Sequence, residues 1–136
     1  MPEQVGVKGP FGPEDVVVGV LAYLASRENE AKFRADAVAV HKVVADLKRE
    51  DRFRELFRGL AFDRRDYFPY SDTLEEILDV LQLAGYLERT NPRGLYYQIR
   101  PALTSMFQKE ILPKFSEEQL NLIEEAAASF RAAVTA

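Results

Sequence analysis

The sequence predicts a mainly helical fold of the α+β class, in which several helices accompany a small antiparallel β-hairpin. Three local patterns lead to this prediction: a capped amphipathic helix over residues 72–84, a tight turn at residues 91–94, and a second clear helix start at Ser116. The chain has 136 residues, a length that fits one domain with a sizeable core.

The helix expected over residues 72–84 has a recognisable start, an apolar stripe and a stop. Ser71 or Asp72 can accept a hydrogen bond from a free N–H group of its first turn. Gly85 is suited to the left-handed conformation that closes a helix, and Tyr86 is placed to cover the last turn. The stripe consists of apolar residues at helical spacing: Leu74, Ile77, Leu78 and Leu81.

A β-hairpin is predicted directly after this helix. The turn Asn91-Pro92-Arg93-Gly94 has proline and glycine at the positions that a type I turn favours. On the returning strand Leu95, Tyr97 and Ile99 share one face, and Tyr96 and Gln98 share the other. Tyr96 is therefore expected to face outward.

The segments before the helix also have helical patterns. A first, largely buried helix is expected from Pro13, and a second helix is expected over residues 33–49. A shorter helical segment is expected over residues 53–60. Residues 61–69 are expected to hold a short strand, which would be the third strand of the sheet.

After the hairpin, a helix is expected over residues 101–112, with an interruption at Pro113. Ser116-Glu117-Glu118-Gln119 is a capping box that opens a last helix. The apolar residues of this last helix form a narrow seam, as in a coiled coil, and we expect it to pack on the domain or, by a slight preference, on a second copy. The seam consists of Leu120, Ile123, Ala127, Phe130 and Val134.

Composition excludes several classes of site. The sequence contains no cysteine, which excludes disulfides and thiolate chemistry and fits a reducing cytoplasm. The apolar run over residues 16–25 is too short to span a bilayer, so no membrane association is expected. We see no signal peptide. The net charge of −4 argues against nonspecific nucleic-acid binding by overall charge but leaves room for a local basic patch.

The order of helices, hairpin and trailing helix resembles the winged helix-turn-helix superfamily. The matching residues run from Tyr70 to Leu103 and include Ala84-Gly85-Tyr86-Leu87-Glu88, the Asn-Pro-Arg-Gly turn and Tyr97-Gln98-Ile99. Phe68-Pro69-Tyr70-Ser71 is also similar to a group of poorly characterised bacterial and archaeal winged-helix proteins that includes relatives of the Panacea antitoxin domain. Residues 1–12 are rich in glycine and proline and are expected to form a flexible lead-in. The resemblance implies a winged-helix-like domain 13–112, followed by a C-terminal helix 113–136 that is a candidate dimerisation element.

In a winged helix, the helix over residues 72–84 would lie in the DNA major groove. Its expected outward residues are mainly acidic, and carboxylates repel phosphates. The acids Glu75, Glu76 and Asp79 are therefore candidates for binding a basic protein partner.

Candidate nucleic-acid contacts lie elsewhere, near the hairpin and in a basic stretch upstream. Phosphate binding would require these residues to share one surface, and the acids interspersed with them favour the alternative of solvated ion pairs. The candidates are Arg52, Arg64, Arg65, Arg89, Arg93 and Tyr96.

No catalytic, metal or cofactor site is expected. His41 is the sole histidine and is expected to be a helix residue at the edge of the core. The sequence therefore predicts a non-enzymatic winged-helix module. Its best-supported role is a DNA-binding transcriptional regulator that binds duplex DNA as a homodimer. The alternative is a protein-interaction module, antitoxin-like or a component of a complex, that uses the acidic helix.

Overall fold

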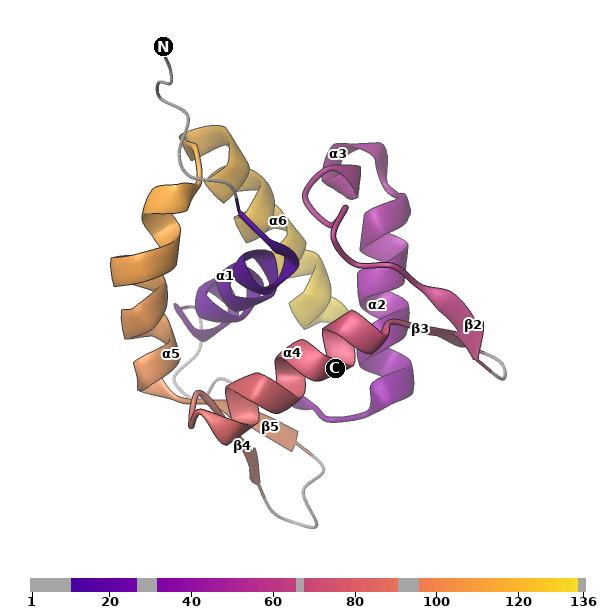
Figure 1. Ribbon diagram of the computed structural model, residues 1–136, viewed down its shortest axis with the longest axis horizontal. Helices are drawn as coiled ribbons and strands as arrows, with labels where there is room; N and C mark the ends of the chain where they lie inside the picture. The colour runs from indigo at the N-terminus through magenta and orange to yellow at the C-terminus, as the bar shows by residue number, and fades with distance from the viewer. Residues whose placement is uncertain (1–10, 27–31, 66–67, 91–95, 135–136) are drawn as a thin grey trace.

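The computed structural model of the chain describes residues 11–26, 32–65, 68–90 and 96–134 and is mostly helical (Figure 1). The helical segments are α1 (Pro13–Ser26), α2 (Ala37–Arg49), α3 (Asp51–Arg54), α4 (Asp72–Leu83), α5 (Pro101–Met106), the π-helical turn η1 (Phe107–Ile111), the 3-10 turn η2 (Leu112–Lys114) and α6 (Glu117–Val134). The strands are β1 (Lys32–Arg34), β2 (Asp63–Arg65), β3 (Phe68–Tyr70), β4 (Leu87–Thr90) and β5 (Tyr96–Ile99).

Helix α1 lies in the middle of the molecule, as its nearly continuous apolar sequence predicts (Figure 1). It packs against α4, α5 and α6. Gly19 permits the close approach of α6, because a Cβ atom at this position would lie 3.1 Å from Cγ2 of Ile123.

A three-stranded antiparallel sheet has the order β1-β5-β4. The expected hairpin is confirmed as β4 and β5, while its turn, including Arg93, lies outside the described residues. The third strand is β1, with Phe33 opposite Tyr97, so the expectation that residues 61–69 supply it is wrong. Those residues instead form the separate β2–β3 hairpin.

The start of the second helix is also corrected. Phe33 lies in β1, and α2 begins at Ala37 because the Asp36 side chain accepts a 3.0 Å hydrogen bond from the N–H of Val38. The ring of Phe33 is buried between Tyr97 and Phe130, at centroid distances of 5.3 and 5.5 Å. Its packing with residues distant in sequence outweighs the local helical pattern.

Both ends of α4 agree with the sequence. The Ser71 hydroxyl accepts a 3.1 Å hydrogen bond from the N–H of Leu74, so Ser71 is the cap. Gly85 has a φ of 86° and follows the last turn. The N–H of Tyr86 donates to the carbonyl of Leu81 at 2.9 Å, which is the 6→1 hydrogen bond of a Schellman motif.

The segment after the sheet differs from the single helix expected over residues 101–112. The α-helical part ends at Met106 and continues as the π turn η1 and the 3-10 turn η2, which contains Pro113. The capping box of α6 is confirmed: Gln119 N–H donates to the Ser116 hydroxyl at 3.1 Å, and Ser116 N–H donates to the Gln119 side chain at 2.8 Å.

The apolar seam of α6 packs within the chain. Ile123, Ala127 and Phe130 are buried, and Leu120 packs against the same core. The side chain of Val134 lies outside the described part. Of the two surfaces expected for this seam, the domain itself covers it, because α1 packs against much of this face of α6. The slight preference for a second copy is corrected accordingly. Homodimerisation itself stays a prediction.

Candidate functional site

The outward face of α4 combines carboxylates with two large exposed apolar side chains. Val80 is 52% exposed and Leu83 is 88% exposed. The acids Asp72, Glu76 and Asp79 are also exposed, and the helix contains no lysine or arginine. This face therefore offers negative charge and apolar contact together.

Val80 also lines a hollow of about 420 Å³, here called the α4 groove, between α1, α4 and the α5–η1 segment. Its apolar lining includes Ala84, Tyr86, Met106 and Ile111. The π turn η1 forms one wall, and such turns occur frequently at functional sites. Val80 belongs both to the exposed face of α4 and to the lining of this groove, so the two surfaces adjoin.

The charges along the α4 groove are mostly negative. The Lys114 ammonium is bonded to the buried Asp15 carboxylate at 3.2 Å, so these two charges offset each other. Glu14 and Glu110 also line the groove and are exposed. Within the described ranges neither of these two carboxylates has a cation within 4.0 Å.

Glu75 has a different environment from the other acids of α4. Its side chain is 30% exposed, and Oε1 lies 3.1 Å from Nε2 of His41. His41 is completely buried, not at the edge of the core as expected, and its ring stacks on Tyr70 at a centroid distance of 4.3 Å. Glu75 thus helps to position α4, and its role in binding a partner stays a prediction.

Near the base of the predicted wing, Arg89 contacts Tyr97 rather than standing free. Its guanidinium donates a 3.2 Å hydrogen bond to the Tyr97 hydroxyl and lies 4.9 Å from the ring centre. Burial raises the pKa of Tyr97, and Arg89 opposes this shift. The nearby carboxylates of Glu75 and Asp79 raise the same pKa further.

Tyr96 faces solvent, with 38% of its surface exposed. It lies opposite Arg34 of β1 and Thr90 of β4 in the sheet. Arg34 is also exposed. The outer face of the sheet therefore has an aromatic ring and a cation on neighbouring strands. The sequence does not indicate this arrangement, because it does not predict the position of β1.

Most of the upstream arginines are in ion pairs. Arg52, an expected nucleic-acid contact, interacts with Glu125 at 2.5 Å and with Glu50 at 3.3 Å. Its guanidinium also lies 4.4 Å from the ring centre of Phe53. Further upstream pairs join Arg54 to Asp51 and Arg58 to Glu55. After the hairpin, Arg100 pairs with Glu88 in the same way. Arg52 already has two carboxylate partners at the surface, and its role as a nucleic-acid contact stays a prediction.

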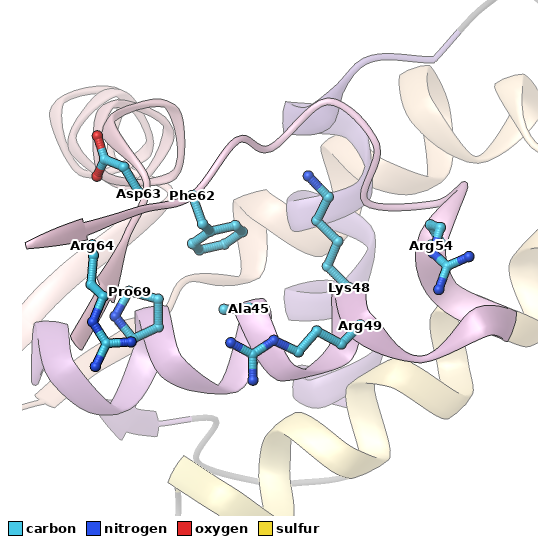
Figure 2. A pocket seen from close by; sticks show the side chains of 8 residues that line it. All are labelled: Ala45, Lys48, Arg49, Arg54, Phe62, Asp63, Arg64 and Pro69. Carbon is cyan, nitrogen blue, oxygen red and sulfur yellow. The ribbon is translucent and has the colours of Figure 1, made fainter.

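A second hollow, here called the basic cleft, lies between α2, the α3 region and the β2–β3 hairpin (Figure 2). Its volume is about 490 Å³, and four cations line it: Lys48, Arg49, Arg54 and Arg64. Of the expected nucleic-acid contacts, the structure places Arg64 here. The side chain of Arg65 lies outside the described part of the chain.

The described residues contain no group of three or more acidic or histidine side chains arranged to hold a metal ion. None of the helices in these ranges combines the length and apolar character that crossing a bilayer requires.

The chain was also compared with known proteins. No family model matches it, and neither does any curated protein or solved structure.

Proposed function

We propose that the chain is a winged-helix-like module that binds a basic protein partner through α4 and the α4 groove. The order of α1, β1, α2, α4 and the β4–β5 hairpin supports a winged-helix arrangement, because β1 pairs with the second strand of the hairpin. In that arrangement α4 has the position of the helix that enters a DNA groove.

The observation that carries the proposal is the composition of the outward face of α4. Glu76 and Asp79 would meet phosphates with like charge, and α4 contains no lysine or arginine. Val80 and Leu83 add apolar surface, which nucleic-acid backbones do not match. A protein segment with Lys or Arg beside apolar side chains complements both features.

The α4 groove indicates the shape of this segment. An apolar side chain of the partner can enter the groove beside Val80, while its cations face Glu14 and Glu110. An amphipathic basic helix has this distribution of side chains, and docking of such a helix into a groove is a common recognition mode.

The test uses the whole chain as bait in its native host and then reconstitutes the binary complex with the purified partner. We expect the double variant Glu76→Lys/Asp79→Lys to weaken this complex at least tenfold, since two attractive contacts become repulsive. Leu83→Ser is expected to weaken it by a similar factor through lost apolar contact.

The matched control is Glu117→Lys/Glu118→Lys, which makes the same charge change at exposed positions of α6. It is expected to retain wild-type affinity. Equal binding of the α4 variant and the wild type to every captured partner would refute the role of α4.

A DNA-binding regulator is the second candidate, favoured by the exposed pair of Arg34 and Tyr96 beside the predicted wing. Such a pair can contact phosphate and stack on a base. This candidate predicts duplex binding that weakens steeply with salt and that is lost in Arg34→Gln/Tyr96→Ala. Absence of duplex binding at low salt would eliminate it.

A further inference from the structure

The basic cleft is lined by cations and is formed by α2, α3 and the β2–β3 hairpin, whereas the proposed partner site is acidic and is formed by other elements. Its volume of about 490 Å³ falls in the range of small-molecule sites. Lys48 and Arg49 come from the last turn of α2, and Phe62 and Arg64 come from the chain leading into and through β2 (Figure 2). Segments separated in sequence thus bring cations and an aromatic ring to one hollow.

Lys48 supplies a positive charge that no carboxylate of the described residues neutralises. Its ammonium donates a 2.5 Å hydrogen bond to the carbonyl of Leu60, which is a neutral acceptor. An ammonium has three N–H donors, so two remain for a ligand. The side chain is partly buried, which strengthens its attraction for an anion relative to a fully solvated lysine.

Two arginines add to this charge. Arg49 lies 3.6 Å from Asp46, but both side chains are more than half exposed, so the pair is weak and its guanidinium can turn to a ligand. Arg64 is exposed and has no ion pair within the described ranges. Asp63 precedes it on the strand and also lines the cleft, and Figure 2 shows its carboxylate pointing the opposite way from the Arg64 guanidinium.

The cleft also has a flat apolar surface. The ring of Phe62 lies between Arg64 and Lys48 in Figure 2, and it faces Ala45 of α2. Phe62 is partly buried, so one part of its ring contacts the protein and another part meets the cleft. Pro69 adds a rigid neighbour, and the small side chain of Ala45 leaves room beside the ring.

We propose that the basic cleft binds a nucleotide, with its base stacked on Phe62, its phosphate held by Arg49 and Arg64, and Lys48 donating to a polar atom of the nucleotide on the other side of the ring. Cations next to an aromatic ring match a ligand that joins a phosphate to a planar base, whereas a bare phosphate would use the cations alone. A free mononucleotide and an unpaired nucleotide within a strand share this chemistry. The proposal stands apart from partner binding at α4.

Calorimetric titration of the full chain at low ionic strength tests the proposal with three probes: adenosine monophosphate, inorganic phosphate and a single-stranded hexathymidylate. Adenosine monophosphate is expected to bind about tenfold more tightly than inorganic phosphate, because stacking on Phe62 adds to charge attraction. Tighter binding of the hexathymidylate than of the mononucleotide would identify a strand as the source of the nucleotide.

Variants assign the contacts. Arg64→Gln and Lys48→Gln are each expected to weaken nucleotide binding about tenfold. Phe62→Leu should remove the preference for the nucleotide over inorganic phosphate. The matched control is Arg58→Gln, which removes the same charge from an exposed residue outside the cleft that is paired with Glu55, and it should bind as the wild type does.

Three outcomes would overturn the proposal: no binding of any probe, a mononucleotide that binds no more tightly than phosphate, or equal losses in Arg64→Gln and Arg58→Gln. The last result would mean that net charge alone attracts the probe. Arg64 is exposed, so Arg64→Gln is expected to fold. It therefore tests the proposal even if Lys48→Gln unfolds the chain.

Discussion

Nε2 of His41 donates a 3.1 Å hydrogen bond to Oε1 of Glu75 and thereby joins α2 to the first turn of α4. The direction follows from the other ring nitrogen, because Nδ1 accepts a 3.0 Å hydrogen bond from the backbone N–H of Ser71. This arrangement assigns the proton of the neutral ring to Nε2. The same imidazole therefore holds both the cap residue of α4 and one of its carboxylates. These two bonds fix the orientation of α4 relative to α2.

Replacing His41 with alanine is expected to lower the free energy of unfolding by about 2–4 kcal/mol. The change leaves a cavity beside Tyr70 and removes the acceptor for the Ser71 N–H. Glu75→Gln is the control, because its amide oxygen can still accept from Nε2–H, and it should stay within about 1 kcal/mol of the wild type. Denaturant unfolding measures both changes. Wild-type stability of His41→Ala would contradict the structural role of this ring.

Phe130→Ala is expected to destabilise the chain by about 3–5 kcal/mol, since the ring is buried against Phe33. Leu83→Ala is the control, because an 88% exposed side chain contributes within about 0.5 kcal/mol. Sedimentation should accompany the unfolding experiment. A Phe130→Ala protein of undiminished stability that changes only from dimer to monomer would show that the α6 seam is an intermolecular contact.

Gly85→Ala is expected to cost about 1–2 kcal/mol of stability, because a φ of 86° is strained for a residue with a Cβ atom. Nothing lies within 4 Å of a Cβ atom built at Gly85, so the cost comes from the backbone and not from a clash. Gly12→Ala provides the comparison: its surroundings are equally open, and a change within about 0.5 kcal/mol is expected there. Thermal unfolding of the two variants should separate them, and equal midpoints would contradict the strain argument.

Stability is expected to fall in alkaline solution, partly through Tyr97. Burial raises the pKa of its hydroxyl in the folded chain. The favourable contribution of the neutral hydroxyl is therefore complete below the ordinary value of about 10 and is lost as the pH rises through the raised value. Tyr97→Phe cannot ionise, so its stability should decline less between pH 8 and pH 11. Identical declines in the variant and the wild type would refute this contribution.

Much of α4 and the start of α6 could be predicted from sequence because their signals are local. Ser71 caps a residue three positions away, Gly85 closes the helix next to it, and the Ser116–Gln119 box lies within one turn. The β4–β5 hairpin could also be predicted from a local signal, since its strands are close in sequence. The acidic character of α4 was equally readable, because helical periodicity separates its outward residues from the buried stripe.

The tertiary structure decided which elements meet. An apolar pattern shows that a face is buried but does not identify the surface that covers it. The local pattern therefore predicts a helix at Phe33, and for the α6 seam it leaves the domain itself and a second copy open, with a slight preference for the copy. The bond between His41 and Glu75 spans 34 positions, and Lys48 meets the Leu60 carbonyl only after the chain turns back beside α2. Local chemistry determined the helix ends and the hairpin, whereas the third strand, the buried histidine and the basic cleft depend on long-range packing.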